Sequence, residues 1–565
     1  MPGEAVTLQL GHYAGCVGAH WWGLQAAALR SPAEAAELRA TALLRAERAA
    51  GGRETLTPRL VALELKGGVG ALRPGGGGPE APVAWDGEVA AYLECASAGG
   101  SAPRDAGRRT EDASSERKGS SSSSAQGASP APSRRRLSQE VYSGSSTQLW
   151  SDYLNVRLHP KSIYVIRQYM HDGDCGCLEA FGQGESLLQD PGCIEELEDR
   201  LHFYVEECDY LQGFQVLCDL HNGFSGVGAK VTELLCDEYS GKGILTWGLA
   251  PVISNMGDSQ KNFYRLMNTA LGIVHLSSHS SLFCPLSLSG SLGIKPQPPV
   301  TFPYINYDAS LDYHSSAVLA AALDTLTAPY RLCSSQGSMM HLAETLNFSG
   351  RKVVAAWASV PFPALHGYSL PDTLCAYQQD VPWKFLSSCR ERKVSCCFAQ
   401  SVVLRGLCQE SHISCPGKQP TSPLHMYEST EQILQRYLHT VFPGAFSTSH
   451  VLEQPCSTLP PYPQFFSPLL TRQGFLLDKP PSYSSTAVES IPVLAALQSS
   501  PVLHTLLYSL YKDLQQLNMR RWASFFAAGV EEDDFQEALE ELRTLSQCYE
   551  TGFEAEDSED EADSD

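Results

Sequence analysis

Two glycine-rich segments, each between a short apolar run and a run with helical spacing, most constrain the fold of this chain. The first is LQLGHYAGCVGAHWW at residues 8–22, and the second is NGFSGVG at residues 222–228. A strand that ends in a glycine segment and continues as a helix is typical of a parallel sheet covered by helices. Such a segment also lets backbone N–H groups approach a phosphate at the start of the helix.

Hydrophobic spacing predicts the same alternation along most of the chain. Strands are expected at residues 5–10, 164–166, 213–220, 243–249, 352–360 and 401–405. Helices are expected at residues 194–211, 229–239, 315–326 and 338–346, and in most of residues 493–549, with a break at Gly529. We therefore expect an α/β protein with a parallel sheet.

Composition narrows the range of functions. The chain has 565 residues, and its 41 Lys and Arg against 63 Asp and Glu give a net charge of −22. Because nucleic-acid binding needs a basic surface, nucleic acid is not an expected partner. The 18 cysteines are scattered and no CxxC…CxxC or HExxH pattern occurs, so we predict reduced thiols and no metal site. No secretory signal or bilayer-spanning apolar run is visible, so any membrane attachment should be peripheral.

Two segments lack the composition of a folded core. Residues 99–148 are rich in serine, proline, glycine and alanine and include the motif RRRLS at 134–138. We expect this insert to be disordered, either as a solvated linker or as the carrier of a phosphorylation site. Residues 551–565 form an acidic tail, which self-repulsion should keep extended.

The second glycine segment is the stronger candidate for phosphate binding. Gly223, Gly226 and Gly228 would expose backbone N–H groups, and the Ser225 hydroxyl could donate a hydrogen bond. The segment lacks the GK[ST] end of a Walker loop and the spacing of GxGxxG. It also fails the GxSxG serine-hydrolase pattern at Val227, and no histidine and acid can be assigned to Ser225. We therefore predict no catalytic residue.

Taken in order, these segments resemble the tubulin superfamily. Residues 9–22 align without a gap with the first strand and loop of tubulins, QAGQCGNQIGAKFW, and CDYLQGFQ at 208–215 matches CDxLQGFQ ahead of GGGTGSG. Later segments resemble the tubulin phosphate loop, the VPFPRLHF strand that opens the middle domain, a later strand of that domain and the paired C-terminal helices; they are residues 180–184, 302–304, 352–360, and 520–526 with 529–541. Within the superfamily, the start GHYAGxVGAHWW and the run LEDRLHFYVEECDYLQGFQ at 197–215 most resemble the misato family.

The resemblance implies a tubulin/FtsZ-like α/β fold. It consists of a parallel Rossmann-like N-terminal sheet with helices on both faces, an α+β middle domain and a C-terminal helical hairpin. The expected boundaries are 1–98 and 149–300 for the nucleotide-binding-type domain, 99–148 for the insert, 301–490 for the middle domain, 491–550 for the C-terminal helices and 551–565 for the tail.

The resemblance also makes GTP the candidate cofactor. The residues that correspond to nucleotide loops are Gly11, His12, Gly182, Gly184, Gly223, Ser225, Gly226 and Gly228. Three residues depart from the tubulin pattern there. His12 and Tyr13 stand where tubulins have a glutamine and a cysteine, and Phe224 stands where they have a glycine. A phenyl group is a steric objection to phosphate at a position where glycine lacks a side chain.

Further departures concern guanine recognition and hydrolysis. On an ungapped alignment, the two positions that read guanine in tubulins become Arg265 and Pro285. Residues 291–299, which we assign to the loop that activates water in a neighbouring subunit, contain no Asp or Glu. We therefore expect no hydrolysis, and nucleotide binding without hydrolysis remains an alternative.

The misato family is associated with mitochondrial distribution, morphology and fusion, acting from the cytosol and the outer mitochondrial membrane. The resemblance thus implies a non-enzymatic regulator of the mitochondrial network, bound peripherally to the outer membrane and acting with the fusion machinery. One alternative is a divergent GTP-binding protein or GTPase. Another is a microtubule or tubulin-assembly partner, a function that the acidic residues 554–565 would suit.

Overall fold

The computed structural model describes most of the chain outside the expected insert. The described residues are 3–48, 54–70, 149–171, 176–253, 259–295, 297–334, 337–366, 368–376, 381–389, 396–407, 423–477, 479, 487–517 and 519–551. Residues 99–148, where disorder was predicted, lie outside the described part of the chain, as does nearly all of the acidic tail. The predicted domain boundaries stay predictions. Among the described helices, none is long and apolar enough to cross a membrane.

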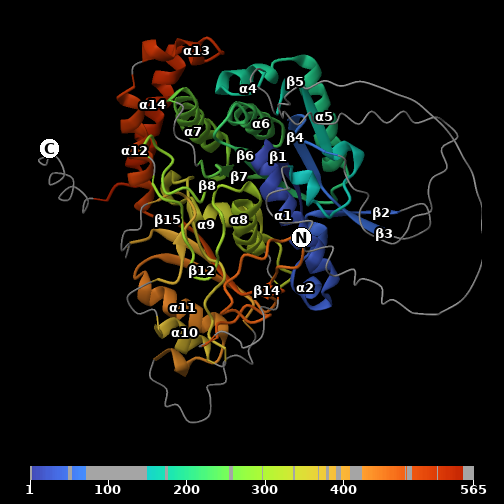
Figure 1. The fold of residues 1–565 in the computed structure, drawn as a ribbon, viewed down its shortest axis with the longest axis vertical. Coiled ribbons are helices and arrows are strands. Elements are labelled where there is room, and N and C mark those ends of the chain that lie inside the picture. The colour runs from blue at the N-terminus through green and yellow to red at the C-terminus, as the bar shows by residue number, and fades with distance from the viewer. Residues whose placement is uncertain are drawn as a thin grey trace, which may run out of the picture. The chain divides into compact units, whose positions relative to one another are not determined.

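A six-stranded parallel sheet forms the N-terminal half of the fold (Figure 1). Its strands, in spatial order, are β5 (Ile163–Met170), β4 (Leu60–Lys66), β1 (Glu4–Leu10), β6 (Leu211–Asp219), β7 (Gly243–Leu249) and β8 (Leu282–Leu286). Each neighbouring pair runs parallel, as the strand–glycine–helix pattern predicted. The carboxyl ends of β5, β4, β1 and β6 therefore meet at one edge of the sheet, where the first glycine segment begins.

Helices cover both faces of this sheet because side chains of a strand alternate between its faces. Val6, Leu8 and Leu10 belong to one hydrophobic cluster, and Ala5 belongs to another. The first cluster includes residues of α4 (Phe181–Leu187), α5 (Pro191–Glu206), α6 (Phe224–Glu238) and α7 (Ser259–His279). The second includes residues of α1 (His12–Arg30), α8 (Asp312–Leu326) and α9 (Met339–Leu346); α2 (Pro32–Glu37) follows α1.

A second, mixed sheet follows the core helix α8. Its strands, in order, are β10 (Lys384–Phe385), β9 (Ala355–Ser359), β15 (Val493–Ser499), β11 (Ala399–Arg405) and β12 (Phe446–Leu452). Helices α10 (Leu370–Ala376) and α11 (Thr430–Val441) share a hydrophobic cluster with it. Two short hairpins pair β2 (Leu44–Arg48) with β3 (Glu54–Pro58) and β13 (Cys456–Ser457) with β14 (Ser490–Ile491).

The structure corrects two expectations about this second sheet. Residues 493–499 were expected to be helical but form β15, which is buried along its whole length between two antiparallel neighbours. A short apolar run buried on both faces has no periodicity that distinguishes a strand from a helix. Residues 302–304, expected in the strand that opens the middle domain, lie before α8 outside any strand. The sequence VPFP itself occurs at residues 360–363, directly after β9.

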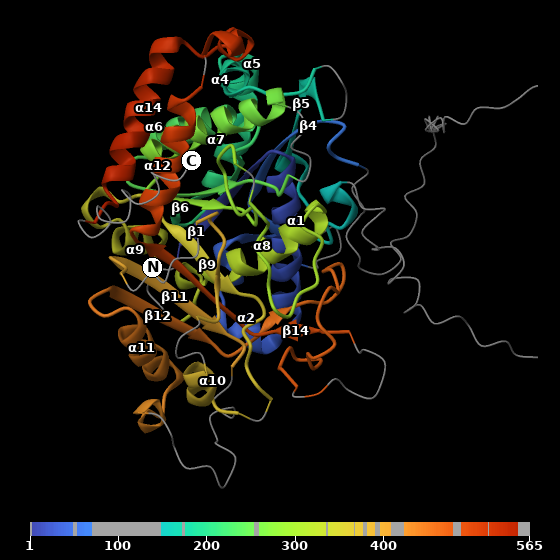
Figure 2. The same ribbon diagram turned by 60° about the vertical axis from the view of Figure 1, so that its left-hand side comes forward.

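The C-terminal helices agree with the predicted hairpin. Helices α12 (Val502–Gln515) and α14 (Glu532–Gln547) lie side by side, with the short α13 (Ala523–Phe526) between them in sequence (Figure 2). The chain breaks at Gly529, whose φ of 119° lies in the left-handed region that favours glycine. Both helices contact α7 and contribute to the same hydrophobic cluster, so the hairpin packs on the outer side of α7.

A buried network of charged side chains ties the first sheet's helices to the second sheet. Asp324 on α8 accepts a hydrogen bond from Arg331 Nη2 at 2.8 Å and pairs with Arg405 on β11. Arg405 also donates to Glu34 on α2 at 2.5 Å, and Arg331 donates to Gln25 on α1 at 2.8 Å. Two arginines thus meet two carboxylates in the protein interior.

The interface between α1 and α8 holds a buried histidine that should make the fold sensitive to acid. His20 Nε2 donates to the Tyr313 main-chain oxygen at 3.0 Å, and the ring stacks on Tyr153. Burial lowers the pKa of His20 to about 3. Because this value lies below the unfolded value of about 6.5, the stabilisation is complete above pH 6.5 and is lost as the pH falls towards 3, by about 1.4 kcal/mol per pH unit.

We therefore expect His20→Phe to flatten the acid side of the stability curve. Between pH 6.5 and 4.5, the free energy of unfolding of the wild type should fall by about 2 kcal/mol more than that of the variant. Denaturant unfolding at several pH values measures the free energy of unfolding of both proteins. If this free energy fell equally steeply with falling pH in both proteins, His20 would not be the source of the acid sensitivity.

Candidate functional site

The first glycine segment ends β1 and begins α1, but its helix start is occupied by a protein carboxylate. Asp219, the last residue of β6, accepts hydrogen bonds from the backbone N–H of Tyr13 at 3.1 Å and of Ala14 at 2.7 Å. Gly11 has a φ of 107°, and a Cβ there would lie 2.5 Å from Asp219 Oδ2. This glycine therefore permits the left-handed backbone and the close approach of the Asp219 carboxylate.

The Asp219 carboxylate is held where a bound phosphate would otherwise accept the same hydrogen bonds. Its side chain is fully buried, and burial raises its pKa to about 7 although the N–H groups of Ala14 and Tyr13 act in the opposite direction. Negative charge at a helix N-terminus is stabilised by the helix dipole. An anionic ligand at this position would have to displace Asp219 or share two N–H groups with it.

The second glycine segment is part of a helix, and the expectation of an open loop at residues 222–228 is wrong. Helix α6 starts at Phe224, and Gly223 before it already has helical angles. Asn222 Oδ1 accepts from the Phe224 N–H at 3.0 Å, and Ser225 Oγ donates to the Asn222 main-chain oxygen at 2.8 Å. The Ser225 hydroxyl thus donates its hydrogen bond to the main chain at the helix start and not to a base.

The glycines of α4 and α6 allow two helices to pack backbone against backbone. A Cβ on Gly184 would overlap the main-chain oxygen of Gly223, and a Cβ on Gly226 would overlap that of Phe181. The start of α4 is fixed from α7, because Asn268 Oδ1 accepts from the Phe181 N–H at 2.8 Å. These glycines therefore have a packing role that is independent of any phosphate.

The remaining predicted residues also face protein groups. A Cβ on Gly182 would lie 2.7 Å from the Gly529 carbonyl carbon in the C-terminal hairpin, and one on Gly228 would overlap Cys218 Sγ. Phe224 is buried and belongs to the hydrophobic cluster that includes residues of α5, α6 and α7, so the predicted steric objection of its ring to a phosphate stays a prediction. Tyr13 is buried and donates to Ser315 Oγ on α8 at 3.0 Å.

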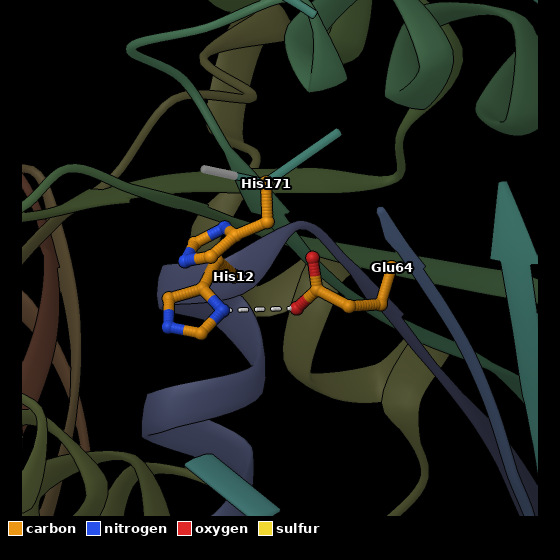
Figure 3. A group of neighbouring side chains, drawn as sticks. All are labelled: His12, Glu64 and His171. Carbon is orange, nitrogen blue, oxygen red and sulfur yellow. Dashed lines mark hydrogen bonds and ion pairs between the residues drawn. The ribbon is translucent and has the colours of Figure 1, made fainter. Parts of the chain in front are cut away.

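His12 and two residues that the sequence did not single out form a cluster at the same edge (Figure 3). His12 Nδ1 lies 3.1 Å from Glu64 Oε2 at the end of β4, and Trp150 Nε1 donates to the same oxygen at 2.9 Å. The His171 ring, directly after β5, lies over the His12 ring with 4.0 Å between centroids. Burial opposes protonation of His12, but Cys16 and Glu64 outweigh it and raise the pKa of His12.

Two other expectations concerned residues assigned by alignment. Arg265 lies on α7. Burial of His221 is the main reason that its pKa is lowered to about 4, and the positive charge of Arg265 acts in the same direction. Pro285 lies inside β8, which is separated from β6 by β7. Residues 291–299 lie between β8 and α8, whereas β9, which leads into the VPFP sequence at 360–363, follows α9. Residues 291–299 are therefore not the loop that precedes the VPFP strand, and their lack of Asp and Glu says nothing of that loop. The composition of residues 291–299 therefore does not bear on hydrolysis.

A separate pocket lies away from the glycine segments. It has a volume of about 420 Å³ between α9, β11 and β12, and it is lined by Pro329, Gly337, Ser338, His341, Leu342, Thr345, Ser401, Thr448 and His450. None of the predicted nucleotide-loop residues lines it. The glycine segments and this pocket are therefore different places in the fold.

Comparison with known proteins identifies the family. Residues 140–332 match the tubulin domain family, and residues 3–133 match the Misato Segment II tubulin-like domain. Protein misato homolog 1 of Bos taurus is 52% identical over 97% of this chain and 98% of the relative. The chain belongs to the misato family. Other misato relatives are Protein misato homolog 1 of Danio rerio, 44% identical over 99% of both chains, and Protein misato of Drosophila melanogaster, 28% identical over 97% of this chain and 98% of that protein.

Membership of the misato family, with its tubulin-like domains, confirms the predicted fold class. Sequence reasoning missed Asp219, Asn222 and Asn268, the side chains that hold the helix starts of this misato chain. A signal existed for Asp219, since an acidic residue directly after a predicted parallel strand lies at the edge where helices begin. No signal existed for Asn268, which acts on α4 from a distant helix.

Proposed function

We propose that this chain is a non-enzymatic, tubulin-like regulator of mitochondrial distribution, morphology and fusion. It acts from the cytosol and is bound peripherally to the outer mitochondrial membrane, where its partners are the fusion machinery. The mitochondrial part rests on the association of the misato family, and the non-enzymatic part rests on the geometry of the glycine segments.

One observation carries the non-enzymatic part: the Asp219 carboxylate accepts both hydrogen bonds at the start of α1. A nucleotide phosphate would have to displace the Asp219 side chain from these N–H groups, and it would meet like charge whenever Asp219, whose pKa is raised to about 7, is ionised. The Ser225 hydroxyl and the glycines of α4 and α6 are likewise committed to protein contacts. GTP binding without hydrolysis is the second candidate, favoured by the tubulin-domain match at 140–332.

The purified full-length protein tests the nucleotide part directly. After denaturation, the supernatant should contain no stoichiometric guanine nucleotide, and added GTP should not be turned over. One equivalent of GTP or GDP per chain would favour the second candidate, and steady-state turnover would overturn the non-enzymatic proposal.

Subcellular fractionation tests the mitochondrial part. We expect the protein in the cytosol and on mitochondria, where external protease should digest it and carbonate should extract it. Protection inside the matrix or resistance to carbonate would contradict a peripheral outer-surface protein. Co-sedimentation with microtubules, with and without residues 554–565, tests tubulin as an alternative partner.

A further inference from the structure

We propose that His12, Glu64 and His171 form a binding site for a transition-metal ion of the Zn²⁺ class. The proposal concerns side chains outside the glycine packing and does not depend on the proposed mitochondrial function or on nucleotide binding. It reverses the prediction of no metal site, which rested on short sequence motifs alone.

The fold brings the three residues together from adjacent strands. Strands β5, β4 and β1 are neighbours in the first sheet, and His171, Glu64 and His12 lie at or just beyond their carboxyl ends. One ligand atom from each residue lies within 4.8 Å of the other two. Figure 3 shows the two imidazole rings beside one carboxylate, with His12 Nδ1 facing Glu64.

The donor set selects the class of metal. Two imidazoles and a carboxylate suit Zn²⁺ and its neighbours Co²⁺ and Ni²⁺, whereas Mg²⁺ prefers oxygen ligands in an octahedron. In a tetrahedral zinc site, ligand atoms 2.0–2.1 Å from the metal are about 3.3 Å from one another. The 3.1 Å between His12 Nδ1 and Glu64 Oε2 already fits this spacing, and one ligand atom from each of the three residues lies within 4.8 Å of the others. Three protein ligands leave a fourth position for water or another ligand.

The carboxylate is oriented by groups that are not ligands. Trp150 Nε1 donates to Glu64 Oε2 at 2.9 Å, and the Leu65 N–H donates to Glu64 Oε1 at 2.8 Å. Such outer partners fix the direction of a ligand and are characteristic of metal sites. An ionised carboxylate has about four acceptor positions, so these two bonds leave room for a metal in place of the His12 hydrogen bond.

The simplest alternative is an ion pair between His12 and Glu64. That pair involves only His12 and Glu64, whereas the His171 ring also lies beside the His12 ring, with 4.0 Å between centroids and 36° between planes. The His12 side chain is 15% exposed against 1% for Glu64, and His171 is also partly exposed, so an ion can reach the carboxylate from the histidine side.

Cobalt titration of the full-length, chelator-treated and reduced protein tests the site. One equivalent of Co²⁺ should bind with visible d–d absorption and without a thiolate-to-cobalt charge-transfer band, which separates this site from binding at cysteines. His171→Ala should weaken Co²⁺ and Zn²⁺ binding at least tenfold. The matched control is His202→Ala, which removes a half-exposed histidine of α5 near Glu238 and should leave binding unchanged.

Replacing one metal ligand by another tests the site by a gained signal and not only by a loss of metal binding. His171→Cys should keep one equivalent of Co²⁺ and acquire the charge-transfer band, because a thiolate then joins the metal. Zn²⁺ should raise the Tm of the wild type and of His202→Ala, but not of His171→Ala. No stoichiometric binding, a thiolate band in the wild type, unchanged affinity in His171→Ala, or no new band in His171→Cys would each overturn the proposal.

Discussion

Replacing Asp324 with asparagine should lower the free energy of unfolding by about 3–5 kcal/mol. The substitution keeps the volume but removes one of two carboxylates that balance Arg331 and Arg405, each about 1% exposed. Only Glu34 then faces the two guanidinium groups within this network, so one positive charge is buried without compensation. Chemical denaturation of the wild type and Asp324→Asn measures the difference.

The pKa of Asp324 gives the sign of the pH dependence. Burial would raise it, but Arg331 and Arg405 outweigh burial and lower it below the usual value. The stabilisation is therefore present above the unfolded pKa of about 3.9 and is lost as the pH falls through the lower folded value. At pH 7 the free energies of unfolding of the wild type and Asp324→Asn should therefore differ by the whole expected amount.

A surface pair provides the control for this prediction. Lys230 and Glu233 lie 2.9 Å apart on α6, with side chains 37% and 42% exposed. Glu233→Gln should cost at most about 1 kcal/mol, because solvent screens an exposed pair. A loss in Asp324→Asn no larger than that in Glu233→Gln would mean that the buried network contributes little to stability.

Alanine at Gly184 or Gly226 should destabilise the protein by about 3 kcal/mol or more, without any ligand present. The added Cβ would overlap a main-chain oxygen of the facing segment, at Gly223 or at Phe181. A main-chain atom cannot rotate away, so relief requires α4 and α6 to separate and lose buried contact. Thermal and denaturant unfolding of the two variants measure the effect.

Gly192→Ala is the matched control on α5. Its nearest neighbouring atom would be Asp190 Oδ2 at 3.8 Å, an ordinary contact. Because alanine favours helix over glycine by about 1 kcal/mol, this variant should be unchanged or slightly more stable. If Gly184→Ala and Gly226→Ala were as stable as Gly192→Ala, close helix packing would not explain these glycines. The same clash makes Gly226 unsuitable for testing nucleotide turnover, since bulky variants would disturb the fold itself.

The sequence predicted the elements that depend on local patterns. Apolar runs followed by glycine predicted β1 and β6 and the helices after them, and three- and four-residue spacing predicted α5. The same patterns failed at β15, because a strand buried on both faces has no alternation to read. They also failed at the start of α6, where glycine favoured a loop on intrinsic grounds and packing against α4 overrode that preference.

The sequence by itself determined that this chain forms a parallel, helix-covered sheet, since strand and helix periods and glycine positions are local properties, and its resemblance to tubulins implied the tubulin-like fold. Only the tertiary structure decided what the glycine segments do. Asp219 reaches the start of α1 from β6, and it lies 206 and 205 residues away in sequence from Tyr13 and Ala14, whose N–H groups it binds. His171 likewise meets His12 and Glu64 only because β5, β4 and β1 are neighbours in the sheet. Contacts between distant segments follow from strand order and helix packing, which no local pattern encodes.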